Sequence, residues 1–349
     1  MELPCGTFNQ NYSQDIAVIR TKSHWGFTIF GLVLLFCLPL FLPTSYVHIL
    51  NYTFIWVIAA LGLQLAMGYT GLISFAQAAL MAVGAYSSAI FTTKLGIPFV
   101  PSMLLSGLTA GLIGLIGGAP SMRIKGFYLA LATLAMHYII YWFVLHSEVT
   151  GGIYGLRVPN ASIGWLEFKT TGQMFYLIGG IMVLMTFFAK NLTRCKVGRA
   201  FVAIRDNDLS AAVMGINVFR YKLLAFFIAS FYAGIAGSLW AHLWNYVHPE
   251  QFGVLMAFFF VGMLIVGGLG SIAGVFFGVF LIRGVEEGLT FAAPSIAAAF
   301  PSIGMHPAAS LAASTFGLIM VLFLLFMPKG LAHSWEILKI SYRRFPFTY

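Results

Sequence analysis

The sequence predicts an all-α polytopic membrane protein, and two observations lead to this fold class. Of its 349 residues, 60% are hydrophobic and 8% are charged, with a mean hydropathy of +0.91. A soluble globular domain carries about 25% charged residues, so this composition excludes that class. The apolar residues also form repeated runs of about 20 residues, the length that an α-helix needs to cross a bilayer.

These runs predict about ten transmembrane spans, within a range of roughly eight to eleven. The third run is rich in Gly, Ala and Ser, so it is either a continuous span or a broken or re-entrant helix. The eighth and ninth are separated only by residues 267–271, so they form a tight hairpin or one irregular element. The expected spans lie at about 25–43, 49–67, 72–92, 99–119, 127–145, 173–189, 223–242, 254–269, 272–290 and 309–327.

The lysine and arginine residues predict the orientation, because cytoplasmic loops carry an excess of both. With the N-terminus in the cytoplasm, all but four of the 19 basic residues lie on the cytoplasmic side. Lys94, Arg157 and Lys169 then lie outside, and Arg283 lies within the ninth span, where it can pair with Glu287. With the N-terminus outside, most of the basic residues would lie outside instead. The net charge of +9 is therefore explained by topology, without a nucleic-acid partner.

This orientation divides the chain into three parts. Residues 1–24 form a cytoplasmic N-terminal segment, residues 25–331 form the transmembrane domain, and residues 332–349 form a cytoplasmic tail. The transmembrane domain contains one long cytoplasmic loop, at 190–222. The sequence has no Walker A, HExxH, CxxC or GxSxG pattern. We therefore expect no catalytic residue, no metal site and no cofactor on this chain, which is not itself an enzyme.

The stretch 197–226 is the longest patterned polar interruption in the chain. Its second half reads as a short amphipathic helix from about Asn207 to Met214, which Asp206 or Asn207 can cap. Gly215 follows the last turn, where a residue in the left-handed conformation is common. Such a helix between two spans is typical of a cytoplasmic docking element or of a helix on the bilayer surface. Its predicted apolar face contains Leu209, Ala212, Val213 and Ile216.

The stretch 68–79, GYTGLISFAQAA, places small and polar residues at membrane depth. Small residues let helices approach closely, and an interrupted helix is tolerated in a membrane where it is buried in protein or lines a cavity. Helix packing is the alternative explanation. On the cavity interpretation, we expect a substrate path that is lined by Gln64, Tyr69, Thr70, Ser74, Gln77, Thr133 and His137.

Residues 198–226, GRAFVAIRDNDLSAAVMGINVFRYKLLAF, resemble the cytoplasmic loop of LivM-type permeases, the membrane subunits of branched-chain amino acid ABC importers (HAAT family). The resemblance covers nearly all of residues 50–331. The family often has Gly-His at the positions of Ala76 and Gln77, and commonly an acidic residue at that of Phe127, so this path is less polar. The other matching motifs are GYTGLISFAQAA at 68–79, RIKGFYLALATL at 123–134, TGGIYG at 150–155, VGGLGSIAG at 266–274 and PKGL at 328–331.

The resemblance implies a permease subunit whose 190–222 loop carries a coupling helix that inserts into an ATPase subunit. It implies a paralogous LivH-type permease, two cytoplasmic ATPase subunits that hold ATP and Mg, and a soluble or lipid-anchored substrate-binding protein. The location would be a bacterial inner membrane, and the substrate a branched-chain amino acid or a related small solute such as urea or an amide. The residues implied in ATPase coupling are Arg199, Arg205, Asp206, Asp208, Leu209, Ala211, Ala212 and Gly215.

A self-sufficient secondary transporter or channel for a small solute is the alternative. That class predicts an inverted repeat and ionisable residues at the membrane midplane for ion coupling. The central spans contain no Asp or Glu, and the two halves of the sequence show no evident repeat. Both observations favour the importer subunit.

Overall fold

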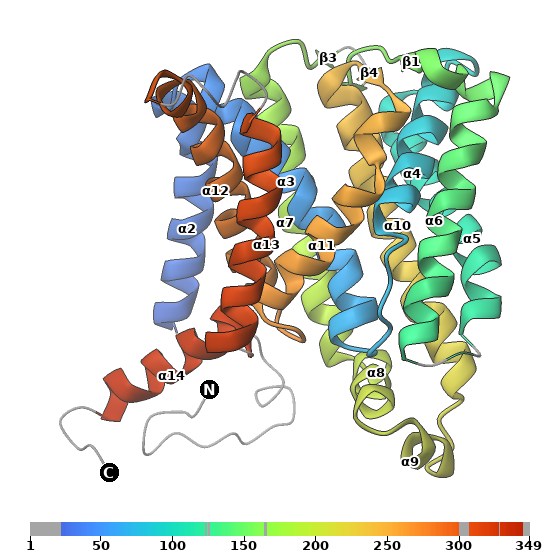
Figure 1. The fold of residues 1–349 in the computed structure, drawn as a ribbon, viewed down its shortest axis with the longest axis vertical. Coiled ribbons are helices and arrows are strands. Elements are labelled where there is room, and N and C mark those ends of the chain that lie inside the picture. Colours follow the sequence, from blue (N-terminus) through green and yellow to red (C-terminus); the bar gives the residue numbers. More distant parts are fainter. Residues whose placement is uncertain are drawn as a thin grey trace.

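The computed structural model describes residues 22–122, 124, 126–163, 166–299, 307–327 and 329–344, so residues 1–21 of the expected N-terminal segment lie outside it. A helix lies at the place of every expected span, and the strands are short and confined to loops (Figure 1). This confirms an all-helical fold. The long helices are α2 (Lys22–Phe41), α3 (Thr44–Leu63), α4 (Gln77–Thr93), α5 (Phe99–Ser121), α6 (Phe127–His146), α7 (Thr171–Arg194), α10 (Val218–Trp244), α11 (Val254–Gly267), α12 (Ile272–Ala299) and α13 (Pro307–Phe326).

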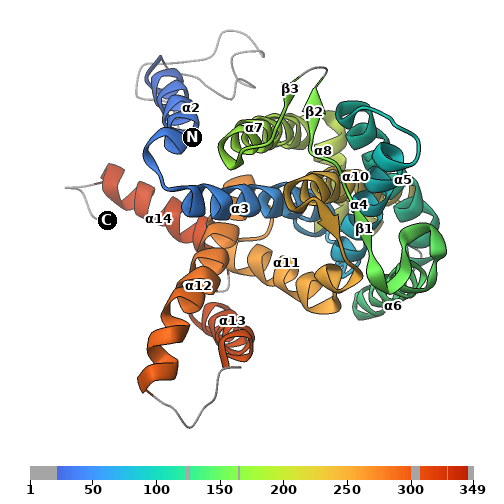
Figure 2. The same cartoon turned by 90° about the horizontal axis from the view of Figure 1, so that it is seen from above.

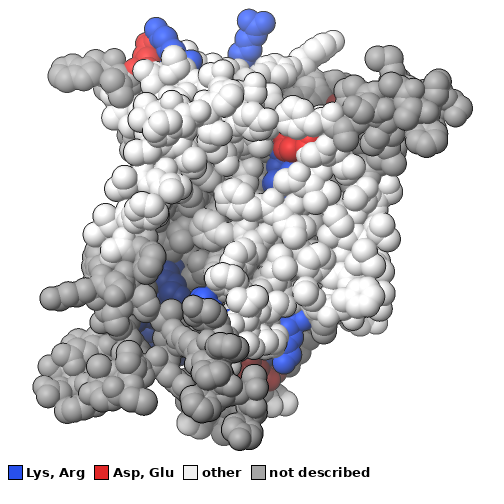
Figure 3. Space-filling model, turned by 90° about the vertical axis from the view of Figure 1, so that its left-hand side faces the viewer, with Lys and Arg blue, Asp and Glu red and all other residues white. Residues whose placement is uncertain are grey.

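The lateral surface identifies the molecule as a membrane protein. Figure 3 shows a side face that is almost wholly uncharged, with Lys, Arg, Asp and Glu gathered towards the two ends apart from one acidic and basic group between them. Among the described residues, six helices are long and apolar enough to cross a bilayer, or seven if the bent pair Ser314–Phe326 and Gly330–Ser341 is counted as one. A polytopic membrane protein is thus confirmed, and the count of about ten spans stays a prediction.

Helices α3 and α10 occupy the interior of the bundle. Viewed along the helices (Figure 2), they lie in the middle, with α7 on one side and α11 on the other, and α10 also packs along α4 and α5. The crossing of α4 and α10 is close because glycines face each other. A Cβ atom on Gly237 would lie 2.0 Å from the Met81 carbonyl oxygen, and one on Gly84 would lie 2.4 Å from the Gly234 Cα. The small residues therefore serve packing here.

The third expected span begins later than predicted, because residues 72–76 are not helical and α4 then runs without a break to Thr93. Helix α3 continues into a π-helical turn, η1 (Gln64–Gly68), and the chain then runs without helix to Ala76, where α4 follows. We call the non-helical residues 69–76 the broken segment. Gly71 has a φ of +77°, a conformation that glycine adopts without strain. Residues 268–271 form a turn between α11 and α12, so the hairpin interpretation of the eighth and ninth spans is confirmed.

The two ends of the bundle carry different polar structures. At one end lie α8 (Lys196–Asp206) and α9 (Asp208–Val213), and at the other lie the strands (Figure 1). Strand β1 (Leu156–Arg157) pairs antiparallel with β4 (Tyr246–Val247), and β2 (Ser162–Ile163) pairs with β3 (Leu166–Glu167). Short 3₁₀ turns lie at η2 (Glu148–Thr150), η3 (Gly152–Tyr154) and η4 (Pro249–Phe252). The described part of the expected tail forms a further helix, α14 (Gly330–Arg344).

Candidate functional site

Helix α9 begins and ends as its sequence predicts. The Asn207 side-chain oxygen accepts hydrogen bonds from the backbone N–H groups of Leu209 (3.0 Å) and Ser210 (3.1 Å), so Asn207 is the N-cap and not Asp206. Gly215 follows the helix with a φ of +84°, and its N–H donates to the Ala212 carbonyl oxygen. The two caps hold a six-residue helix that is too short to be stable alone.

The outer side of α9 exposes a cluster of apolar side chains, which we call the α9 tip: Leu209, Ala212, Val213 and Met214. Leu209 is 71% exposed and Val213 is 86% exposed. Ile216, the fourth residue of the predicted apolar face, is half-buried instead. Ala211 is buried against the chain itself, so it is not available to a partner. An apolar tip on a polar loop that projects from the molecule (Figure 1) is typical of a docking surface.

Helix α8 supports this tip from behind, and the sequence analysis missed it. Its Phe201 and Ile204 side chains are buried, which makes it amphipathic. Asp208 at the start of α9 forms an ion pair of 3.6 Å with Lys222 of α10, and both side chains are largely buried. Asp208 therefore fixes the position of α9, whereas Arg199 on α8 is exposed.

Arg205 joins α8 to the end of the π-helical turn. Its Nη1 donates a hydrogen bond of 3.1 Å to the Gly68 carbonyl oxygen, and its Nε and Nη2 donate to the Asp206 carboxylate. Two glycines make room for the side chain: a Cβ on Gly270 would lie 2.9 Å from Nη1, and one on Gly71 would lie 3.3 Å from Cγ. The predicted coupling residue Arg205 thus contacts the end of the π-helical turn of the same chain, and Asp206 pairs with Arg205.

Gln64 joins the same π-helical turn to the hairpin of α11 and α12. Its buried Nε2 donates to the carbonyl oxygens of Gly268 (3.1 Å) and Ser271 (2.9 Å). The other amide atom, Oε1, is buried without a hydrogen-bond partner among the described residues. Burying an amide group costs free energy unless it is hydrogen-bonded. The two bonds offset this cost and cross-link the π-helical turn to the hairpin. We call Gln64, Gly68, Arg205, Gly268 and Ser271 the inner junction.

A cavity of about 340 Å³ separates the broken segment from the α8–α9 loop. Thr70, Gly71 and Leu72 line one side, and Arg205 and Lys222 contribute to the other. The predicted coupling loop and part of the predicted path therefore share one space.

The remaining predicted path residues divide into two groups. Thr133 on α6 faces the broken segment, where its hydroxyl accepts from the Phe75 N–H (3.1 Å). His137, one turn further along α6, is buried, and neither ring nitrogen has a hydrogen-bond partner among the described residues. Ser74 accepts from the Ala76 N–H. Thr70 and the half-buried Tyr69 lie nearer the inner junction, and the Thr70 hydroxyl donates to the Leu65 carbonyl oxygen.

Gln77 cross-links three helices of the core. Its Nε2 donates to the carbonyl oxygens of Ala59 on α3 (2.7 Å) and Ala229 on α10 (3.4 Å). We expect Gln77→Leu to lower uptake while the complex still assembles, because α4 loses its cross-link to α3 and α10, and a hydrogen bond contributes about 0.5–1.5 kcal/mol. Uptake by proteoliposomes and the subunit ratio of the purified complex measure both effects. Unchanged uptake would mean that transport does not depend on this cross-link.

Arg283 forms the charged group within the membrane-spanning part. It pairs with Glu287 (2.6 Å), as expected, and also with Glu286 on the same helix. Its guanidinium lies 4.0 Å from the centre of the Tyr52 ring, a cation–π contact. The buried charge of Arg283 is therefore paired with two glutamates of its own helix. Within the described part of the chain, no group of three or more His, Cys, Asp or Glu could hold a metal ion.

Comparison with known proteins places this architecture among permeases. The family model described as branched-chain amino acid transport system, permease component, matches residues 45–327. The chain is 30% identical to the high-affinity branched-chain amino acid transport system permease protein LivM of Escherichia coli K12. The alignment extends over 270 residues and covers 70% of this chain and 64% of that protein. The chain thus spans less than two thirds of that relative, and 62% of LivM of Salmonella typhimurium.

More distant relatives carry other names. A probable branched-chain amino acid transport permease protein LivH of Methanocaldococcus jannaschii is 28% identical over 247 residues, covering 68% of this chain and 78% of that protein. The autoinducer 2 import system permease protein LsrC of E. coli O9:H4 is 24% identical over 288 residues, covering 74% of this chain and 77% of that protein. The similarity therefore extends over permeases named for different substrates.

Proposed function

Because the chain belongs to the family of branched-chain amino acid transport system permease components, we propose that it is the permease subunit of an ATP-driven ABC importer in a bacterial inner membrane. The match to this family over residues 45–327 carries the proposal. The proposed substrate is a branched-chain amino acid. A related small polar solute is the second candidate, since LsrC is named for autoinducer 2 import.

The proposed complex contains two permeases, two cytoplasmic ATPase subunits and a substrate-binding protein. Similarity to both LivM and LivH proteins supports a paired permease of the LivH type. ATP and Mg would be held by the ATPase subunits, and this chain would bind no cofactor. The exposed α9 tip supports the ATPase contact, because it offers an apolar surface to a protein groove.

The inner junction supports a route for coupling. When ATP closes the ATPase pair, α9 would move with the groove that holds it, and α8 would follow. Arg205 would transmit this movement to Gly68 and the broken segment, and Gln64 would carry it to the α11–α12 hairpin. Nucleotide can drive the change only if its states bind the outward-open and inward-open forms differently.

The test of the proposal is reconstitution. The chain should co-purify with an ATPase and a second permease, and ATP hydrolysis should rise when the loaded binding protein is added. Uptake without any ATPase would favour a self-sufficient transporter instead. Measuring hydrolysis with branched-chain amino acids, urea and short amides in turn would identify the substrate class.

The orientation gives a separate prediction. Cys195 is exposed between α7 and α8, so with Cys5 and Cys37 replaced by serine it should react with an impermeant thiol reagent only from the cytoplasmic side. Lys169→Cys, at the opposite end, is the matched control and should react only from outside. Labelling of Cys195 in intact cells would overturn the orientation and place both termini outside.

A further inference from the structure

Helix α14 leaves the bundle with most of its apolar side chains uncovered. The chain bends by 45° between α13 and α14, and α14 runs obliquely away from the bundle at the α8–α9 end (Figure 1). Its first turn packs closely on the protein, where a Cβ on Gly330 would lie 2.5 Å from the Gly268 Cα, and the Trp335 ring lies 6.2 Å from the Phe277 ring of α12. Further along, Trp335, Ile337, Leu338 and Ile340 are 46% to 58% exposed.

The same helix is basic towards its end. Its sequence contains Lys339, Arg343 and Arg344 against a single acidic residue, Glu336. The Lys339 Nζ lies 5.3 Å from the centre of the Trp335 ring. A helix that combines exposed apolar side chains, tryptophan and lysine or arginine is suited to the interface between lipid headgroups and acyl chains.

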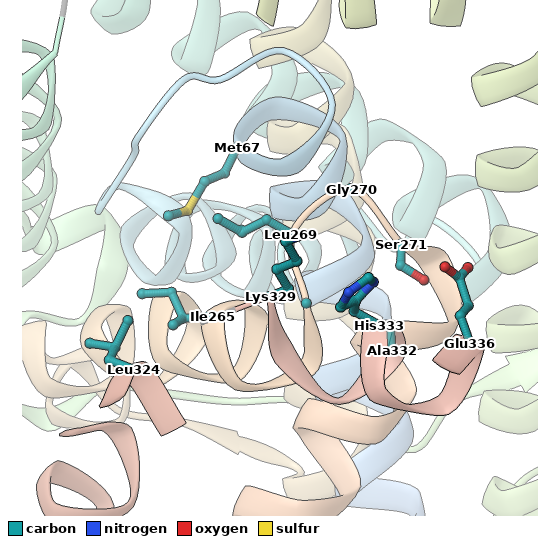
Figure 4. Close-up of a pocket in the computed structure, with 11 residues that line it drawn as sticks. Met67, Ile265, Leu269, Gly270, Ser271, Leu324, Lys329, Ala332, His333 and Glu336 are labelled. Atoms are coloured by element: carbon teal, nitrogen blue, oxygen red, sulfur yellow. The ribbon is translucent and has the colours of Figure 1, made fainter. Parts of the chain in front are cut away.

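A cavity of about 520 Å³ lies at the base of this helix. Figure 4 shows that its lining changes from one end to the other. Met67, Ile265 and Leu324 lie at the apolar end, and Ser271 and Glu336 lie at the polar end. Lys329 and His333 lie between them, at the corner where α13 gives way to α14. A ligand that fits this lining has a charged part and an apolar part.

We propose that this cavity and α14 bind a phospholipid of the leaflet at the α8–α9 end. Its phosphate lies at Lys329, its acyl chains lie along the apolar end of the cavity and the Trp335 side chain, and Lys339 rests on neighbouring anionic headgroups. Charge complementarity favours anionic lipid, since each lysine or arginine near such a surface contributes about 1 kcal/mol. The bound lipid holds α14 against Gly268, which is a residue of the inner junction.

Native mass spectrometry of the purified complex tests the headgroup site. After exchange into equal amounts of phosphatidylglycerol, phosphatidylethanolamine and phosphatidylcholine, we expect phosphatidylglycerol to be retained preferentially. Lys329→Ala should weaken this retention about fivefold, the ratio that corresponds to about 1 kcal/mol, and Lys329→Arg should preserve it. Lys190→Ala removes an exposed cation of α7 and should have no effect. Equal retention by Lys329→Ala and the unchanged chain would overturn the site.

Tryptophan quenching tests whether acyl chains are involved. The fluorescence of Trp335 is the difference between the signals of the unchanged chain and of Trp335→Phe. In vesicles of phosphatidylglycerol with brominated acyl chains, the bromine atoms should quench this fluorescence. Added inorganic phosphate should not relieve the quenching, since free phosphate has no acyl chain. An unquenched Trp335 signal would mean that another protein surface or a soluble anion occupies this region, and it would overturn the lipid assignment.

Discussion

Replacing Ala212 with arginine is expected to abolish ATP-driven uptake and to weaken the retention of the ATPase subunits. Ala212 lies at the α9 tip between Leu209 and Val213, and all three side chains are exposed. In the proposed complex this surface enters a groove, where a small residue permits close approach. An arginine would hold the helix away, and a charge buried without a partner is strongly disfavoured. Co-purification and substrate-stimulated ATP hydrolysis in the reconstituted complex measure the two effects.

Ser210→Arg is the matched control for this substitution. It adds the same side chain to the same short helix, but the spacing of two residues places it on the opposite side of the helix from Ala212. We expect this variant to retain the ATPase and most of its uptake. Should Ala212→Arg also leave both intact, α9 would be an ordinary helix on the membrane surface, and the proposed coupling would lose its mechanical basis.

The parts of the fold that the sequence predicts correctly depend on local patterns. Apolar runs locate the helices because hydrophobic length is a property of consecutive residues. The N-cap at Asn207, the left-handed Gly215 and the Arg283–Glu287 pair each involve residues within four positions of one another. The small and polar residues between Gly68 and Ala79 likewise coincide with the non-helical residues 69–76, which precede α4 and do not interrupt it.

The inner junction could not be predicted, because its contacts join distant parts of the chain. Arg205 and Gly68 are 137 positions apart, and Gln64 and Gly268 are 204 apart. Periodicity shows that a side chain lies on one face of a helix but not which partner that face meets. For this reason the sequence predicts that Arg205 contacts a partner protein, whereas in the structure it forms a hydrogen bond with its own chain. Ala211 likewise reads as part of the docking surface but is buried.

The role of Arg205 follows from this internal bond. A hydrogen bond to a charged group contributes about 1.5–3 kcal/mol when buried, and the partial exposure of this side chain lowers that value to about 1 kcal/mol. The Gly68 carbonyl group lies at the end of a π-helical turn, where the backbone already departs from α-helical bonding. Loss of the bond would therefore loosen the connection between α8 and the broken segment without changing the α9 tip.

Arg205→Ala is accordingly expected to lower the uptake per ATP hydrolysed by about fivefold, the ratio that corresponds to about 1 kcal/mol, while the ATPase subunits stay bound. This result differs in kind from that of Ala212→Arg, which should release them. Lys196→Ala is the control, because it removes an exposed cation from the same helix, and its uptake should stay near that of the unchanged complex. Simultaneous measurement of substrate uptake and phosphate release in proteoliposomes gives the ratio. A fall in ATPase retention for Arg205→Ala, with the ratio unchanged, would instead place Arg205 at the surface that contacts the ATPase.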